Sequence, residues 1–117
     1  MPTEARPLID RFIAALDGRR LDDLDACGDA GFRAQAPSAA LAPVLDGMNA
    51  VLGRRLRTGE PSVTQSDGGG SRLSIAVPAS HERGASIVHL VAARDPNGRW
   101  AVSHCTARSA AFEWVMR

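Results

Sequence analysis

The chain has 117 residues, which is enough for one domain with a sizeable core and too few for two, so residues 1–117 are expected to form a single domain. A net charge of +1 provides no strong electrostatic field, so the sequence implies neither a nucleic-acid partner nor a membrane surface. It contains no apolar run of membrane-spanning length and no apolar core of a signal peptide, so a cytoplasmic location is expected.

The first predicted element is an amphipathic helix that begins near Leu8 and ends at Gly18. Its apolar residues recur at helical spacing and are Leu8, Ile9, Phe12, Ile13, Ala15 and Leu16. A shorter helix is predicted over 21–27, stopped by the glycines that follow it. Residues 32–36 alternate weakly and predict a strand, closed by Pro37.

The middle of the chain predicts one further helix. Residues 38–45 are rich in Ala and Pro and are expected to be irregular, passing over the mouth of the fold. Asp46 is a plausible N-cap for a helix over 47–57. Arg54, Arg55 and Arg57 then lie at its C-terminal end, where cations suit the helix dipole. We interpret this cluster as a solvated helix end, with anion binding as the alternative.

The second half of the chain predicts strands over 62–66, 73–77, 86–94 and 99–108. The connections are rich in turn residues, and the one over 81–84 is expected to expose His81. The glycine-rich turn at 67–70 lacks the residues of a phosphate loop. The tail over 111–117 is expected to pack on the body or on a partner. The pattern predicts an α+β fold, with a curved mixed or antiparallel sheet wrapped around the N-terminal helices.

The last two strands are predicted to form a hairpin in which Arg94 pairs with Arg99. In this register His89 and His104 become direct cross-strand neighbours on the outer face. The same face carries a bulky apolar patch of Val91, Trp100 and Val102, which predicts a homodimer. The inner face of this hairpin is expected to carry Val88, Leu90, Ala92, Ala101, Ser103 and Cys105.

Three stretches resemble the nuclear-transport-factor-2-like superfamily, which includes ketosteroid isomerase and the SnoaL-like polyketide cyclases. They are RFIAALDGRRLDDLDA, LDGMNAVLGRRL and VHLVAARDPNGRWAVSHCTAR, in that order. The resemblance covers roughly nine-tenths of the chain, and it depends on order and spacing rather than on one sharp motif. It implies a cone-shaped, cystatin-like α+β barrel with an apolar pocket on the concave face and a convex face that forms dimers.

The resemblance does not extend to the catalytic residues of ketosteroid isomerase. That enzyme uses an Asp base, with a Tyr and a protonated Asp that hold the oxyanion. The matching positions here are Phe12 for the Tyr, Ala36 for the base and Leu90 for the second Asp. A steroid-isomerase mechanism is therefore not supported, although the pocket can remain.

Other residues could still carry proton transfer. His89 and His104 are read either as an acid–base pair, as a metal pair or as polar residues at an interface. Asp25 is a possible carboxylate partner, and its alternative is a helix-surface charge. The residues expected to line the pocket are Phe12, Leu16, Phe32, Ala34, Ala36, Val88, Leu90, Ser103 and Cys105.

Neither a metal nor a cofactor is expected. Two His without a nearby carboxylate are a weak signal for a metal site, and Cys27 and Cys105 lie far apart without metal-ligand spacing and are interpreted as buried or semi-buried thiols. Two functions follow from the sequence. One is binding of a small hydrophobic metabolite, with isomerase, cyclase or dehydratase chemistry by proton transfer. The other is a non-catalytic dimerisation or ligand-sensing module with a degenerate active site.

Overall fold

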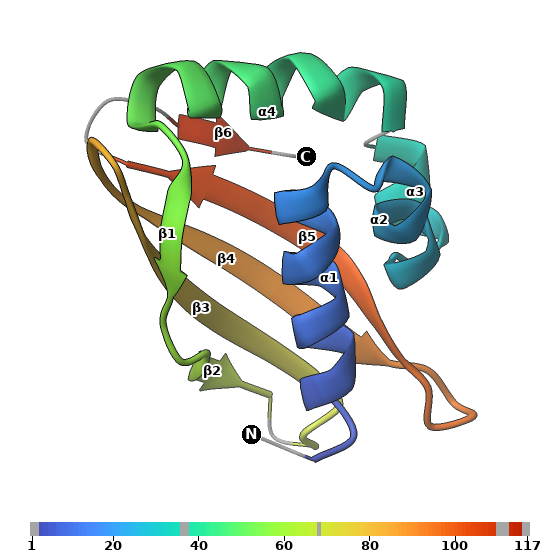
Figure 1. The fold of residues 1–117 in the computed structure, drawn as a ribbon. Coiled ribbons are helices and arrows are strands. Elements are labelled where there is room, and N and C mark those ends of the chain that lie inside the picture. The colour runs from blue at the N-terminus through green and yellow to red at the C-terminus, as the bar shows by residue number, and fades with distance from the viewer. Residues whose placement is uncertain (1–2, 36–37, 68, 110–112, 116–117) are drawn as a thin grey trace.

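The computed structural model describes residues 3–35, 38–67, 69–109 and 113–115, which form an α+β fold built on a curved, open antiparallel sheet (Figure 1). The four helices come first in the chain, and α1 lies across one face of the sheet while α4 spans its upper end. The helices are α1 (Arg6–Gly18), α2 (Leu21–Cys27), α3 (Ala30–Gln35) and α4 (Ser38–Leu52). No helix among the described residues is long and apolar enough to cross a membrane.

The sheet has six strands, and every pair of neighbouring strands is antiparallel. The order is β1-β3-β4-β5-β6, and β2 also pairs with β3, further along the edge that β1 occupies. The strands are β1 (Arg55–Thr58), β2 (Ser62–Ser66), β3 (Arg72–His81), β4 (Gly84–Arg94), β5 (Trp100–Arg108) and β6 (Glu113–Val115).

The first two helices lie where the sequence predicts them. The apolar stripe of α1 is buried, and Phe12 meets Phe32 of α3 edge to face, with ring centroids 5.8 Å apart. The left-handed residue after α1 is Arg19 (φ 54°) rather than Gly18. The amide of Arg20 then donates to the Ala15 carbonyl, which satisfies one of the last carbonyls of the helix.

The predicted strand over 32–36 is wrong, because residues 30–35 form α3. Asp29 begins this helix: its Oδ1 accepts from the amide of Phe32 at 2.8 Å, and its carbonyl accepts from the amide of Arg33. This is the N-cap arrangement that favours a helix over a strand. Phe32 is fully buried, whereas Ala34, predicted to line the pocket, is exposed, and Ala36 lies outside the described residues.

The region predicted to be irregular before Asp46 is also helical, because α4 begins at Ser38 and continues to Leu52. Alanine is the best helix former and supports this start, while Pro43 lies on an exposed position within the helix. The helix ends five residues earlier than predicted. Gly53 adopts a left-handed conformation (φ 78°), which turns the chain from α4 into β1.

The last turn of α4 is capped from the sheet by Arg83, in the turn between β3 and β4. Its Nη2 donates to the Ala50 carbonyl at 2.9 Å, and its Nε donates to the Val51 carbonyl at 3.3 Å. Its amide also donates to the Leu52 carbonyl at 2.8 Å. Arg83 therefore supplies the cation at the helix end that we assigned to the cluster of Arg54, Arg55 and Arg57, together with hydrogen-bond donors.

Strand β3 runs four residues beyond its predicted end at Val77. Pro78 does not stop it, because this residue lies where the edge of β3 changes partner from β2 to β1. A proline has no amide to donate, and at this point none is needed. Its carbonyl accepts from the amide of Gly59 at 2.8 Å.

The predicted register of the last hairpin is wrong by one residue from the turn onward, and a bulge further along the β4–β5 ladder adds a second shift. Arg94 pairs with Trp100 and Val91 pairs with His104, with a shift between Val91 and Ala92. The shift at the turn places Val102 opposite Ala92 in the core and leaves Ala101 half-buried, the reverse of the prediction. The bulge then leaves Ser103 half-buried and keeps Cys105 in the core, where it was predicted. Trp100 is half-buried, packs beside the core and lies under the guanidinium of Arg94 at 5.7 Å.

Candidate functional site

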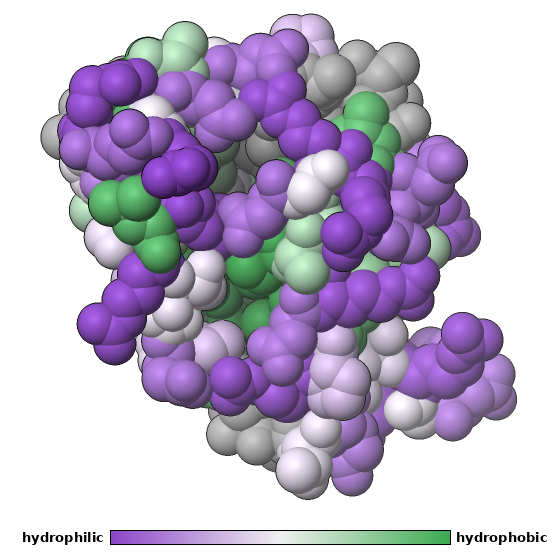
Figure 2. Space-filling model, viewed as in Figure 1, coloured by the Kyte–Doolittle hydropathy of each residue, from purple (hydrophilic) through white to green (hydrophobic). Residues whose placement is uncertain are grey.

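A cavity of about 510 Å³ lies between the C-terminal ends of α1 and α4, strand β1 and the inner face of the sheet. Its apolar wall comes from Leu16, Met48, Val88, Cys105 and Ala107. Its polar wall comes from Asp17, Arg19, Asn49, Arg54, Arg55, Arg57, Thr58 and His81. Gly53 and Leu56 complete the lining. In Figure 2, hydrophilic side chains surround the hollows on this side of the molecule, and apolar side chains lie deeper.

The polar wall centres on Asp17 and Arg55, which come from different elements. Asp17 is in the last turn of α1, and Arg55 is the first residue of β1. The Arg55 Nε lies 2.8 Å from Asp17 Oδ1, but its N–H is not aligned for a hydrogen bond. Only 14% of the Arg55 side chain is exposed, so this guanidinium is held largely away from water.

Burial dominates the ionisation of this pair. It raises the pKa of the Asp17 carboxyl, against the opposing charges of Arg55 and His81. It also lowers the pKa of the Arg55 guanidinium, against the attraction of Asp17. Arginine stays protonated nonetheless. For both groups, the attraction between the two charges is smaller than the cost of removing each charge from water.

His81 lies beside Arg55, because the two residues pair directly across β1 and β3. The imidazole is 8% exposed, and its Nε2 lies 2.7 Å from the hydroxyl of Ser86, which is also buried. Its Nδ1 has no hydrogen-bond partner among the residues that the structure describes. Ser86 thus orients the ring, and the other ring nitrogen is left for a further group.

Three of the residues predicted to line the pocket lie in this wall: Leu16, Val88 and Cys105. Burial raises the pKa of the Cys105 thiol well above its usual range, so no thiolate is available there. Phe12, Phe32 and Leu90 lie in the surrounding core instead. Ser103 is half-buried outside the cavity, where its hydroxyl donates to the Val91 carbonyl at 3.3 Å.

None of the three candidate proton-transfer residues lines the cavity. His89 and His104 project from the outer face of the sheet, since strand side chains alternate between faces. His89 pairs with Thr106 and His104 with Val91, so the two histidines are diagonal rather than direct neighbours. Asp25 is half-buried on α2, where its Oδ1 has no partner among the described residues.

His81 was predicted to be exposed, but the alternation of buried residues along β3 indicates that it is buried. The buried positions of β3 are every second residue, and they are Leu73, Ile75, Val77, Ala79 and His81. Because the predicted strand ended before Ala79, the prediction did not include Ala79 and His81 in this alternation. Asp17 and Arg55 carried no comparable signal, because only the tertiary fold brings the end of α1 beside β1.

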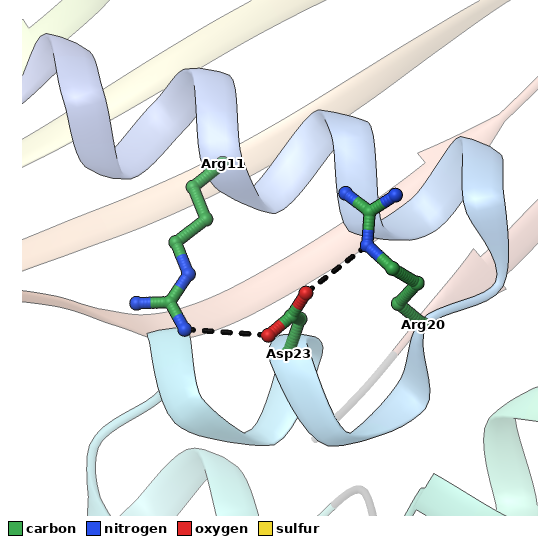
Figure 3. A network of polar contacts seen from close by, with 3 residues as sticks. All are labelled: Arg11, Arg20 and Asp23. Atoms are coloured by element: carbon green, nitrogen blue, oxygen red, sulfur yellow. Dashed lines mark hydrogen bonds and ion pairs between the residues drawn. The ribbon is translucent and has the colours of Figure 1, made fainter.

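Other polar clusters lie outside the cavity. Asp23 of α2 accepts from the Arg20 Nε at 3.0 Å and from the Arg11 Nη2 at 3.3 Å (Figure 3). These contacts lower the pKa of the Asp23 carboxyl, the hydrogen bond from Arg20 most of all. In the part of the chain that the structure describes, no three His, Cys, Asp or Glu residues are grouped so that they could hold a metal ion.

No protein-family model, no curated protein and no solved structure matches this chain.

Proposed function

We propose that the cavity binds a small organic molecule with a large apolar surface, as the resemblance to nuclear-transport-factor-2-like proteins implies. The observation that carries this proposal is the cavity itself, about 510 Å³ with one apolar and one polar wall. Small-molecule sites fall in this size range and combine apolar walls with a few convergent polar groups. The cone-shaped, cystatin-like form of the fold is part of the same proposal, as is a cytoplasmic location for a chain whose two cysteines are free thiols.

If the bound molecule reacts, proton transfer falls to His81 and Asp17. Both line the cavity, and the charge of His81 acts on Asp17. An imidazole and a carboxyl group whose pKa is raised by burial are side chains that can transfer protons. This is the isomerase, cyclase or dehydratase alternative, with the acid–base role moved from His89, His104 and Asp25 to the wall of the cavity.

A blocked cavity tests the binding proposal. Ala107→Leu places a larger side chain in the apolar wall, whereas Ala76→Leu makes the same change on the outer face of β3. The probe is naphthylmethanol, an uncharged aromatic alcohol, and binding is measured by calorimetry. We expect the parent and Ala76→Leu to bind it and Ala107→Leu to bind at least about tenfold more weakly. Equal binding by all three folded proteins would place the probe elsewhere and contradict the proposal.

A second candidate is a homodimerisation module that uses the outer face of the sheet. Figure 1 shows α1 lying across only one face. The outer face carries Ile87, which is 37% exposed, together with the half-buried residues Ala76, Val91 and Ala93. Apolar residues gathered in this way are typical of protein interfaces. Val102 and Trp100, which we predicted as the core of this patch, take little part, because Val102 points inward and Trp100 packs beside the core.

A further inference from the structure

We infer that the ligand of the cavity is an amphipathic carboxylate, whose anionic end binds Arg55 and whose apolar body lies against the opposite wall. This inference deepens the proposed function and depends on it. The supporting observation is a largely buried guanidinium with donors to spare.

The donors of Arg55 are only partly used. Its Nη1 donates to the hydroxyl of Thr58 at 3.2 Å, and its Nε faces Asp17 without a hydrogen bond. Within the described part of the chain, no hydrogen bond is made by Nη2. A guanidinium has five N–H donors, so several of them are free to bind an acceptor. The buried donor is Nε, which Asp17 already faces, whereas Nη2 keeps contact with solvent and is accessible to an acceptor that enters the cavity.

The charges around the cavity favour an anion. Four arginines line it and one acidic residue does. Arg19 forms an ion pair with Asp46, and Arg54 lies 4.0 Å from Glu82. Arg57 makes no ion pair with any described residue. If Asp46 and Glu82 are counted together with Asp17, the four arginines face three carboxylates. An anion that enters the cavity therefore meets a net positive charge.

The planar geometry of the Arg55 guanidinium favours a carboxylate as the anionic group. The guanidinium is planar and presents its N–H groups as a fork that matches two carboxylate oxygens.

The structure also explains why the arginine cluster is not a solvated helix end. Arg55 and Arg57 belong to β1, and the end of α4 is capped by Arg83.

The apolar wall selects the rest of the ligand. Leu16, Val88 and Ala107 lie on the side of the cavity formed by α1 and the sheet. Burying apolar surface there contributes roughly 25 cal/mol for each Å² removed from water. A free inorganic anion would meet only the polar wall, so the geometry favours a molecule with both an anionic end and an apolar body.

The experiment compares two probes that differ in one group, naphthoate and naphthylmethanol. Binding of each is measured by calorimetry to the parent and to the double variant Asp17→Asn/Arg55→Gln, which removes the pair without changing the net charge. The matched control is Asp23→Asn/Arg20→Gln, which removes an ion pair outside the cavity (Figure 3). Circular dichroism and thermal midpoints establish that each variant is folded.

We expect the parent and the control to bind naphthoate at least about tenfold more tightly than naphthylmethanol. The cavity variant should lose this preference and still bind naphthylmethanol. Added salt should weaken naphthoate binding to the parent and leave naphthylmethanol binding unchanged. This salt test needs no variant, and Arg55→Lys, which keeps the charge and loses the fork, should retain only part of the preference.

Each contrary result has a distinct meaning. If both probes bind the parent equally, the carboxylate inference is overturned and the proposed function stands. If the preference survives in the cavity variant, Arg55 is not the anion site. If the parent binds neither probe, the proposed function fails and the inference fails with it.

Discussion

The backbone of Gly28, at the end of α2, lies directly against the ring of Phe32 in α3. A Cβ added to Gly28 would come within 2.4 Å of Phe32 Cδ1. The contact holds the α2–α3 corner to the sheet, because Gly28 forms a bridge with Val102 and the next amide, of Asp29, donates to the Val102 carbonyl at 2.9 Å. The backbone conformation of Gly28 does not require glycine, because its φ of −91° suits any residue. Glycine is needed there because a side chain would collide with Phe32.

The first prediction follows from this contact. Gly28→Ala should lower the free energy of unfolding by about 1–3 kcal/mol, the range for overpacking a filled core. Gly31→Ala is the control: its added Cβ would meet only the Asp29 carboxylate, at 3.4 Å, and it should be neutral or slightly stabilising. Urea denaturation measures both. Adding Phe32→Leu should reduce the effect of Gly28→Ala, and additive effects would mean that Phe32 is not what the methyl group meets.

The second prediction concerns the pH dependence of stability at Asp17. Because its folded pKa is raised above the ordinary value of 3.8, the folded state binds this proton more tightly than the unfolded state does. The contribution of Asp17 is thus most favourable below pH 3.8 and declines as pH rises through the folded pKa. The free energy of unfolding of Asp17→Asn, relative to the parent, should therefore increase with pH above that point. The change should be small, since 42% of the side chain is exposed.

For Asp23→Asn, we expect stability relative to the parent to change with pH in the direction opposite to that for Asp17→Asn. The pKa of Asp23 is lowered by its hydrogen bonds to Arg20 and Arg11, so its contribution is present above pH 3.8 and is lost as pH falls through the folded pKa. Relative to the parent, this variant should become less stable as pH rises from below the folded pKa of Asp23 to its ordinary value of 3.8. Denaturation curves at closely spaced pH values test both. Slopes of the same sign would show that burial does not dominate at Asp17.

The third prediction is that neither thiol reacts in the folded protein. Cys27 is 2% exposed and Cys105 is fully buried, and burial raises the pKa of both thiols. The thiolate is the reactive form, so labelling by a disulfide reagent at pH 8 should wait for opening of the structure and should speed up with urea. Ser62→Cys, exposed on β2, should add one thiol that reacts at once. Rapid labelling of the parent would show that the core around these cysteines is open.

The fourth prediction tests the outer face. Ile87→Glu places a charge where the proposed homodimer would bury an apolar side chain, and it should shift the protein to monomer in sedimentation velocity at tens of micromolar (about that order). Val63→Glu, on β2, changes a valine that is also 37% exposed but pairs with the buried Ile75 and so lies on the other face of the sheet. It should leave the association unchanged. If the parent protein sediments as a monomer, the proposed homodimer is contradicted.

Local patterns in the sequence decided the parts of the fold whose determinants lie close together in the chain. The apolar spacing of α1 and α2 and the alternation of β4 and β5 identified these elements, because a buried face repeats with the period of its own helix or strand. Local signals failed where two of them competed. Residues 32–35 alternate weakly, but the Asp29 cap makes them helical. Pro78 is a strand breaker in isolation, but it occupies a position that needs no amide.

Tertiary structure alone decided the candidate site. The sequence predicted that Leu16, Val88 and Cys105 would line a pocket, but it gave no reason to place Asp17 beside Arg55 or to bury His81 next to both. These residues are 26 or more positions apart, and their meeting depends on where α4 ends and how β1 pairs with β3. The turn of the β4–β5 hairpin and a bulge further along its ladder each shifted the predicted register of β5 by one residue. Because strand side chains alternate, a one-residue shift exchanges inside with outside, and no pattern within the strand itself determines where that shift occurs.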